Sequence, residues 1–165
     1  MRKQKLAGEI TGYARSEATR AKAMEISLVD KVFPTAAETV KDADLVILCS
    51  PVGTYGELAR EIGPRLSQGA ILTDVGSVKG AVVRDVLPHV PQDVSFIPGH
   101  PIAGTEQSGP ESGFAELFIN RWCILTPLPD SDPGAVERLA DLWRACGSNV
   151  EVMTPEHHDL VLAIT

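Results

Sequence analysis

Asp44-Leu-Val-Ile-Leu-Cys-Ser50 is a continuous apolar run of strand length, and Pro51 ends it. A second run of this kind, Ala70-Ile-Leu-Thr-Asp74, follows a segment with helical spacing at residues 54–66. Runs rich in Val, Ile and Leu without polar alternation are typical of strands buried on both faces of a parallel sheet. The two runs therefore predict neighbouring parallel strands joined by a crossover helix.

Strands and helices alternate on both sides of these two runs. We expect further strands at residues 9–13, 94–97, 121–126 and 150–153, and a connector or strand at 28–32. We expect further helices at residues 16–26, 36–43, 78–90, 109–118 and 134–146, and from residue 155 onward. Strands that alternate with helices of about ten residues imply right-handed βαβ units. The predicted fold class is α/β, doubly wound, with a mostly parallel sheet.

The composition limits the partners and the compartment. A net charge of −7 over 165 residues argues against nucleic acid or an anionic membrane surface as the main partner. The sequence has no apolar run of transmembrane length and no signal-peptide core, so we expect a cytoplasmic protein. Cys49, Cys123 and Cys146 lie in or beside apolar segments without zinc-finger spacing, so we expect buried, reduced thiols.

A histidine lies in the segment Ser95–Gly109, SFIPGHPIAGTEQSG. Pro98 and Pro101 bracket His100 and should stiffen a loop around it. Histidine is suited to proton transfer near neutral pH, so His100 is a candidate acid or base, although a lone histidine is often structural. Ligands of such sheets bind at the carboxyl ends of the strands, where we expect Ser77 to emerge at the same edge as His100.

The turn after the second apolar run, Asp74-Val-Gly-Ser-Val-Lys79, combines a glycine with polar side chains. Gly76 should allow a tight turn, and Ser77 should lie at a helix N-terminus, where its hydroxyl could cap the helix or face a ligand. Lys79 would lie in the first helical turn, where the helix dipole disfavours a cation. This conflict favours an electrostatic role for Lys79 toward a substrate or partner.

Two other strand ends bear on a cofactor. Cys49-Ser50-Pro51-Val52 could line a crevice, or Pro51 could simply end its strand. Dinucleotide-binding folds usually hold the ribose hydroxyls with an acid after the second strand, where this chain has Ala14. Arg15 and Ser16 follow and could accept a 2′-phosphate, which favours NADP over NAD; alternatively, Arg15 is a solvent-exposed residue.

Two adjacent histidines, His157 and His158, lie in the last expected helix. Adjacent residues of a helix point in different directions, so we do not expect them to share a metal ion. The sequence predicts no metal site.

Several segments resemble the prephenate and arogenate dehydrogenase family of tyrosine biosynthesis. The most specific are DVGSVKG (Asp74–Gly80) and GHPIAGTEQSGPESGFAELF (Gly99–Phe118); CSPV (Cys49–Val52) and TPEHHDLVLAIT (Thr154–Thr165) fit as well. Within the family, the chain looks most like bacterial cyclohexadienyl dehydrogenases. The resemblance implies a Rossmann-like domain and a reaction with NAD or NADP. That reaction is the oxidative decarboxylation of prephenate to 4-hydroxyphenylpyruvate, of arogenate to tyrosine, or of both.

The resemblance also implies roles for single residues. The family histidine that matches His100 contacts the ring hydroxyl of the substrate and assists its deprotonation, and the serine that matches Ser77 hydrogen-bonds the same hydroxyl. The implied substrate-binding residues are Gly104, Thr105, Glu106 and Ser108. The implied cofactor-binding residues are Arg15, Ser16, Cys49, Ser50, Pro51, Val52, Asp74 and Ser77.

The chain also departs from the family. Members begin with a strand and a G-x-G-x-x-G turn, which nothing here matches, and end with a helical domain that forms a homodimer. We therefore expect residues 1–153 to be an incomplete nicotinamide dinucleotide-binding domain that lacks the first strand and glycine-rich turn. Residues 154–165 should begin a linker helix to a missing dimerisation domain. The alternatives are another NAD(P)-dependent dehydrogenase of related fold, or an inactive binding module.

Overall fold

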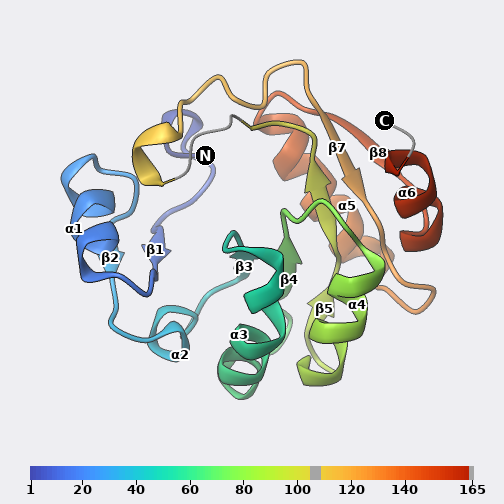
Figure 1. The fold of residues 1–165 in the computed structure, drawn as a ribbon, viewed down its shortest axis with the longest axis horizontal. Coiled ribbons are helices and arrows are strands. Elements are labelled where there is room, and N and C mark those ends of the chain that lie inside the picture. Colours follow the sequence, from blue (N-terminus) through green and yellow to red (C-terminus); the bar gives the residue numbers. More distant parts are fainter. Residues whose placement is uncertain (105–108, 164–165) are drawn as a thin grey trace.

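The computed structural model describes residues 1–104 and 109–163. Figure 1 shows their strands and helices alternating along the chain. The strands are β1 (Thr11–Gly12), β2 (Lys31–Val32), β3 (Leu45–Leu48), β4 (Ile71–Asp74), β5 (Ser95–Phe96), β6 (Gly99–Pro101), β7 (Trp122–Leu125) and β8 (Asn149–Val152). The helices are α1 (Glu17–Glu25), α2 (Ala36–Thr39), α3 (Tyr55–Ile62), α4 (Gly80–Val86), α5 (Pro133–Ala145) and α6 (Pro155–Leu162). No helix of the described residues is long and apolar enough to cross a membrane.

The strands from β3 to β8 join through one bent segment. β3, β4 and β5 pair in parallel, and β7 pairs in parallel with β8. β5 leads directly into β6, which pairs antiparallel with β7. Backbone hydrogen bonds continue through the bend, from Ile97 N to Leu72 O and from Thr126 N to Pro98 O. The predicted mostly parallel α/β sheet is confirmed.

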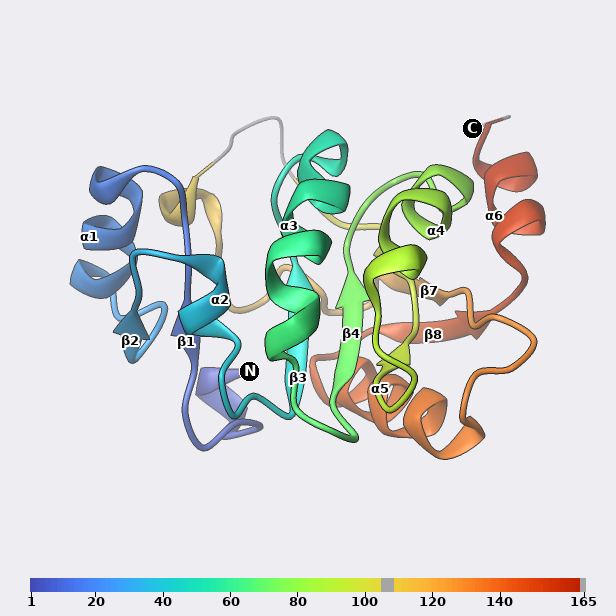
Figure 2. The ribbon, with the colours of Figure 1, turned by 90° about the horizontal axis from the view of Figure 1, so that it is seen from below.

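Helices cover both faces of this sheet, because successive strand residues point to opposite sides. Leu72 of β4 packs with α2, α3 and α4, whereas its neighbour Ile71 packs with α5. Phe96 and Ile97 divide in the same way. Figure 2 shows α3 and α4 lying in front of the strands they cover. This alternation produces the two hydrophobic cores of a doubly wound fold.

Side-chain caps begin four of the described helices. Ser16, Thr35 and Thr154 each accept a hydrogen bond from a backbone N–H three residues later, at the starts of α1, α2 and α6. Asp132 caps α5 in the same manner. Each cap satisfies a backbone donor that has no partner inside its helix.

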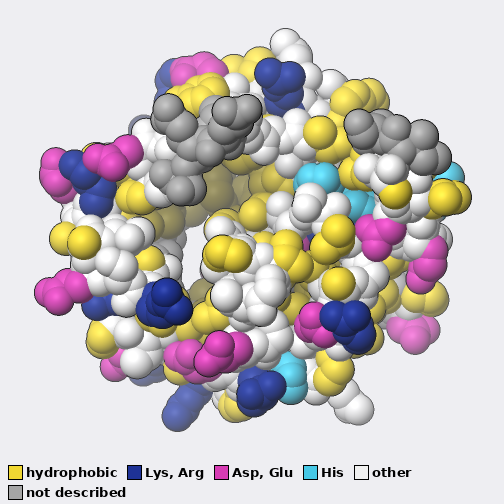
Figure 3. Space-filling view, in the orientation of Figure 1, with side chains coloured by type: hydrophobic (Ala, Val, Ile, Leu, Met, Phe, Trp, Pro, Cys, Tyr) yellow, Lys and Arg dark blue, Asp and Glu magenta, His cyan; other side chains and the backbone are white. Residues whose placement is uncertain are grey.

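β1 and β2 form a separate parallel pair, and among the described residues no strand pairing joins them to β3. α1 packs beside them without a buried residue. The hydroxyl of Thr11 on β1 donates to Thr39 O at the end of α2, which links this region to the larger sheet. Figure 3 shows a hollow with hydrophobic side chains between this region and the part formed by α3 and β3.

Three expectations about local structure are wrong. His100 lies on β6 rather than in a loop, because its backbone pairs with Ile124 of β7. The helix expected at 109–118 is only a short 3-10 turn at Pro110–Ser112 followed by turns. Gly109 precedes that turn with a φ of 98°, a left-handed conformation that does not belong to a right-handed helix. β3 is also less buried than expected, since only Leu48 is fully enclosed.

The three cysteines are free, as expected, but they do not share one environment. Cys123 and Cys146 are buried, whereas Cys49 is exposed because it lies beyond the end of β3, where the chain leaves the sheet.

Candidate active site

The turns after β3 and β4 lie against each other at the carboxyl edge of the sheet. Leu48 and Asp74, the last residues of the two strands, are paired, and Val75 N donates to Leu48 O at 3.2 Å. A Cβ atom on Gly76 would lie 2.8 Å from Val52 Cγ2, so only glycine permits this approach. The predicted cofactor-binding turns at residues 49–52 and 74–77 are therefore neighbours in space.

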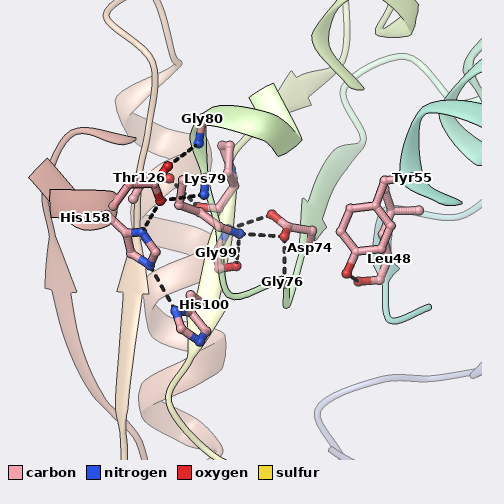
Figure 4. A network of polar contacts seen from close by, with 12 residues as sticks. Leu48, Tyr55, Asp74, Gly76, Lys79, Gly80, Gly99, His100, Thr126 and His158 are labelled. Carbon is pink, nitrogen blue, oxygen red and sulfur yellow. Dashed lines mark hydrogen bonds and ion pairs between the residues drawn. The ribbon is translucent and has the colours of Figure 1, made fainter. Parts of the chain in front are cut away.

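A buried ion pair adjoins these turns. Lys79 Nζ lies 2.5 Å from Asp74 Oδ2, and both side chains are 0 % exposed. Figure 4 shows the ammonium between Asp74 and the carbonyl of Gly99, to which it donates at 2.6 Å. Burial raises the pKa of Asp74 and lowers that of Lys79, while the attraction between the two groups opposes both shifts.

This arrangement corrects two interpretations of the sequence. Lys79 is enclosed by protein, so its charge is balanced by Asp74 and not by a substrate or partner at the surface. Asp74 also accepts hydrogen bonds from Gly76 N and Gly99 N, so its carboxylate is directed into the protein rather than toward a cofactor. The pair ties the end of β4 to the start of β6 and thereby fixes the backbone that carries His100.

Ser77 lies exposed on the same turn. The interpretation of Ser77 as a helix cap is wrong, because α4 begins only at Gly80 and its first N–H groups are capped from another helix. The carboxylate of Asp159 on α6 accepts from Lys79 N at 2.7 Å and from Gly80 N at 2.8 Å. The alternative interpretation, in which the Ser77 hydroxyl faces a ligand, stays a prediction.

His100 faces a second histidine from α6. His100 Nδ1 lies 2.9 Å from Nε2 of His158, and Nδ1 of His158 lies 2.8 Å from Asp159 Oδ1 (Figure 4). His158 is 0 % exposed, and His100 is partly buried. Burial lowers the pKa of His100 to about 4, with further contributions from His158 and Lys79, and Asp159 opposes the shift. A neutral imidazole with one bare ring nitrogen is able to accept a proton.

The remaining predicted residues lie apart from this cluster. Ser16 caps α1, and Arg15 has an exposed side chain while its carbonyl accepts from Arg20. Gly104 is exposed just beyond β6. The predicted substrate-binding residues Thr105, Glu106 and Ser108 lie outside the described residues.

Comparison with known proteins agrees with this architecture. Residues 1–152 match the family described as the nucleotide-binding domain of prephenate dehydrogenase. The chain belongs to the prephenate dehydrogenase family. It is 40% identical over 153 residues to a cyclohexadienyl dehydrogenase from Zymomonas mobilis, an alignment that covers 93% of this chain and 52% of the relative.

Solved structures show the same fold for this prephenate dehydrogenase domain. Prephenate dehydrogenase from A. aeolicus, in complex with hydroxyphenyl propionate and NAD+, matches with a TM-score of 0.88 and 36% identity. That match covers 97% of this chain and 56% of the other. Synechocystis arogenate dehydrogenase matches with a TM-score of 0.86 and 32% identity, over 93% of this chain and 54% of the other. The chain thus spans about half the length of these relatives.

Two residues of this cluster, His158 and Asp159, are not predicted from the sequence. The sequence offers His158 only as half of a histidine pair that is unsuited to a metal ion, and it gives Asp159 no distinguishing feature. The sequence does carry a signal, because the cap Thr154 and Pro155 fix the start of α6 and hence the place of His158 one turn later. What it lacks is the docking of α6 against α4 and β6, which alone brings His158 to His100.

Proposed function

We propose that this prephenate dehydrogenase domain binds NAD or NADP and supports the oxidative decarboxylation of prephenate, arogenate or both. The observation that carries the proposal is a neutral histidine, His100, which is held at Nδ1 by His158 and follows Gly99, the residue hydrogen-bonded to Asp74 and Lys79. The relative from Z. mobilis is named as a cyclohexadienyl dehydrogenase, and the A. aeolicus enzyme was crystallised with NAD+ and hydroxyphenyl propionate. The hydroxyphenyl propionate of that complex carries a hydroxylated ring, which agrees with a ring hydroxyl as the group that meets His100.

The residues at the strand ends fit a nicotinamide dinucleotide. The adjoining turns at 49–52 and 75–77 offer small and exposed groups, and the close approach of Gly76 to Val52 leaves no side chain between them. Arg15 and Ser16 lie between β1 and α1. We propose that these turns would hold the cofactor, which would supply the hydride acceptor when bound, and that Asp74 supports the turns from inside the protein.

The chemistry assigned to the chain itself is proton transfer and positioning. His100 accepts the proton of the substrate hydroxyl, because a neutral imidazole near pH 7 has a free electron pair for it. Ser77 hydrogen-bonds the same hydroxyl and so places it against the imidazole. Thr105, Glu106 and Ser108 stay predictions for the substrate loop, together with Gly104. A homodimer and a cytoplasmic location also stay predictions.

A turnover assay tests this function on the protein expressed at its natural length. Nicotinamide absorbance is followed with prephenate and with arogenate, each with NAD+ and NADP+. His100→Asn should lower kcat/KM by roughly 10²- to 10⁴-fold, the usual contribution of a positioned base. His157→Asn is the matched control, because His157 is exposed on α6 one residue from His158, and it should retain activity.

Absence of turnover with either substrate, from folded protein that binds NAD(P), would point to another dehydrogenase of related fold. Absence of both cofactor binding and turnover would favour the inactive module. The expected preference for NADP over NAD is tested separately by Arg15→Ala, which should weaken the binding of NADP+ more than the binding of NAD+.

A further inference from the structure

Three side chains from two distant parts of the sequence form a continuous hydrogen-bonded chain. Asp159 and His158 come from α6, and His100 comes from β6. The contacts run from Asp159 Oδ1 to His158 Nδ1 at 2.8 Å and from His158 Nε2 to His100 Nδ1 at 2.9 Å. The two imidazole planes are inclined at 62°, so the rings meet edge to face (Figure 4).

The carboxylate end of this chain is an acceptor. Asp159 receives two backbone N–H groups, from Lys79 at 2.7 Å and from Gly80 at 2.8 Å. Partial burial pushes the pKa of Asp159 upward, but the hydrogen bonds from Gly80, Lys79 and His158 outweigh it and the pKa is lowered. An ionised carboxylate can only accept, so His158 Nδ1 must donate and must carry a proton.

The direction of the next hydrogen bond follows from the first. A neutral imidazole protonated on Nδ1 has a bare Nε2, which can only accept. His100 Nδ1 must then donate to His158 Nε2, and neutral His100 is left with its proton on Nδ1 and a bare Nε2. Within the described residues, no hydrogen bond is made to His100 Nε2.

We propose that Asp159 and His158 are positioning residues that fix His100 as the Nδ1–H tautomer, so that its Nε2 is the atom that receives a proton from the substrate hydroxyl. The fixed tautomer stands on geometry alone, and its use on a hydroxyl rests on the proposed function. When Nε2 takes the proton, His100 becomes an imidazolium, and its Nδ1–H bond to His158 becomes charge-assisted and stronger.

The charges around His100 agree with this assignment. Lys79 is a cation that disfavours positive charge on His100, but it is paired with Asp74 at 2.5 Å. Asp159, on the far side of His158, favours positive charge on His100. The hydrogen-bonded chain therefore links a proton gained at His100 to the carboxylate of Asp159, which also caps α4. Neither His100 nor His158 is fully exposed to solvent.

NMR spectroscopy determines the tautomer directly. In protein labelled with ¹⁵N, long-range correlations of the imidazole protons distinguish a protonated ring nitrogen from a bare one, near pH 7.5. We expect both His100 and His158 to show a protonated Nδ1 and a bare Nε2. A protonated Nε2 on His100 would overturn the proposal in the native protein, without any variant.

Two substitutions of His158 separate polarity from packing. In His158→Leu the acceptor is lost, and His100 should give a mixture of tautomers; in His158→Gln the amide oxygen can still accept, and the Nδ1–H form of His100 should persist. His157→Gln, on the same helix but exposed, should leave the His100 signals unchanged. Unchanged His100 signals in folded His158→Leu would also contradict the proposal.

Kinetics give the functional consequence. His158→Leu should lower kcat by roughly 10- to 100-fold with little change in KM. This loss is smaller than the one expected for His100→Asn, because the base itself is still present. His158→Gln should recover most of the rate. A loss confined to KM would show a merely structural role. If the tautomer is as expected but neither prephenate nor arogenate turns over, the proposed function fails and the positioning of His100 stands.

Discussion

The first 35 residues and the region from β4 to α6 are stabilised by different kinds of interaction. None of residues 1–35 is buried, and their ion pairs, such as Arg2 with Asp30 and Lys31 with Glu9, lie at the surface. The second region encloses Asp74, Lys79 and His158 completely and joins them through hydrogen bonds. Exposed pairs contribute little to stability, whereas a buried charge that loses its partner is costly. Substitutions of the same type should therefore have very different effects in the two regions.

The largest effect is expected for Lys79→Met, which leaves the buried carboxylate of Asp74 without its cation. The free energy of unfolding should fall by about 3–5 kcal/mol in urea titrations at pH 7. Lys31→Met removes the partner of Glu9, which lies 2.6 Å away on the surface, and should cost a small fraction of that amount. Equal losses of unfolding free energy in Lys79→Met and Lys31→Met would contradict the contrast between the two regions. Asp74→Leu added to Lys79→Met should recover much of the stability.

A somewhat smaller effect is expected in the core under α5. Leu139 is 1 % exposed, and Leu139→Ala should lower the free energy of unfolding by roughly 3 kcal/mol through lost burial and a residual cavity. Leu28, 48 % exposed near β2, is the matched position, and Leu28→Ala should change stability by no more than about 0.5 kcal/mol. A comparable loss at Leu28 would show that the N-terminal region is packed more firmly than its exposure indicates.

A pH effect of intermediate size is expected from His100. Its pKa is lowered from 6.5 in the unfolded chain to about 4 in the folded one, so the unfolded state binds more protons between these values. The contribution to stability is present above about pH 6.5 and is lost as the pH falls toward 4, by at most about 1.4 kcal/mol per pH unit. His100→Asn should show a smaller decrease between pH 6.5 and 4 than the native protein, in parallel urea titrations. An identical decrease in the two proteins would contradict the lowered pKa of His100.

The smallest effect should come from the cap of α1. Ser16→Ala removes the side chain that accepts from Thr19 N and should cost about 1 kcal/mol. Because α1 has no buried residue, the loss should appear in hydrogen exchange of α1 and not in global unfolding. Thr154→Ala removes the corresponding cap of α6, a helix coupled to α4 by Asp159, so its loss should reach the amides at the start of α4. Loss of protection confined to α6 would break this distinction.

Most of the fold could be predicted from the sequence, because its signals are local. The runs 44–50 and 70–74 contain β3 and β4, and the ranges 16–26 and 134–146 contain α1 and most of α5. The errors occurred where local and long-range preferences conflict. Residues 99–101 resemble a proline-rich loop, yet they pair with β7, and the helix expected at 109–118 ends as a 3-10 turn at Gly113, whose backbone is extended.

The sequence by itself determined which segments are strands and helices, where most helices begin, and that His100 and Ser77 belong to one edge of the sheet. Hydrophobic periodicity and capping act within a few residues, so they can be read from the chain alone. Only the tertiary structure decided the partners of the buried polar groups. Asp74, Lys79 and Gly99 meet across the sheet, and Asp159 caps a helix that begins 79 residues before it, through its bond to Gly80. A buried charge is stable only beside the partner that the whole fold brings to it, and no local pattern names that partner.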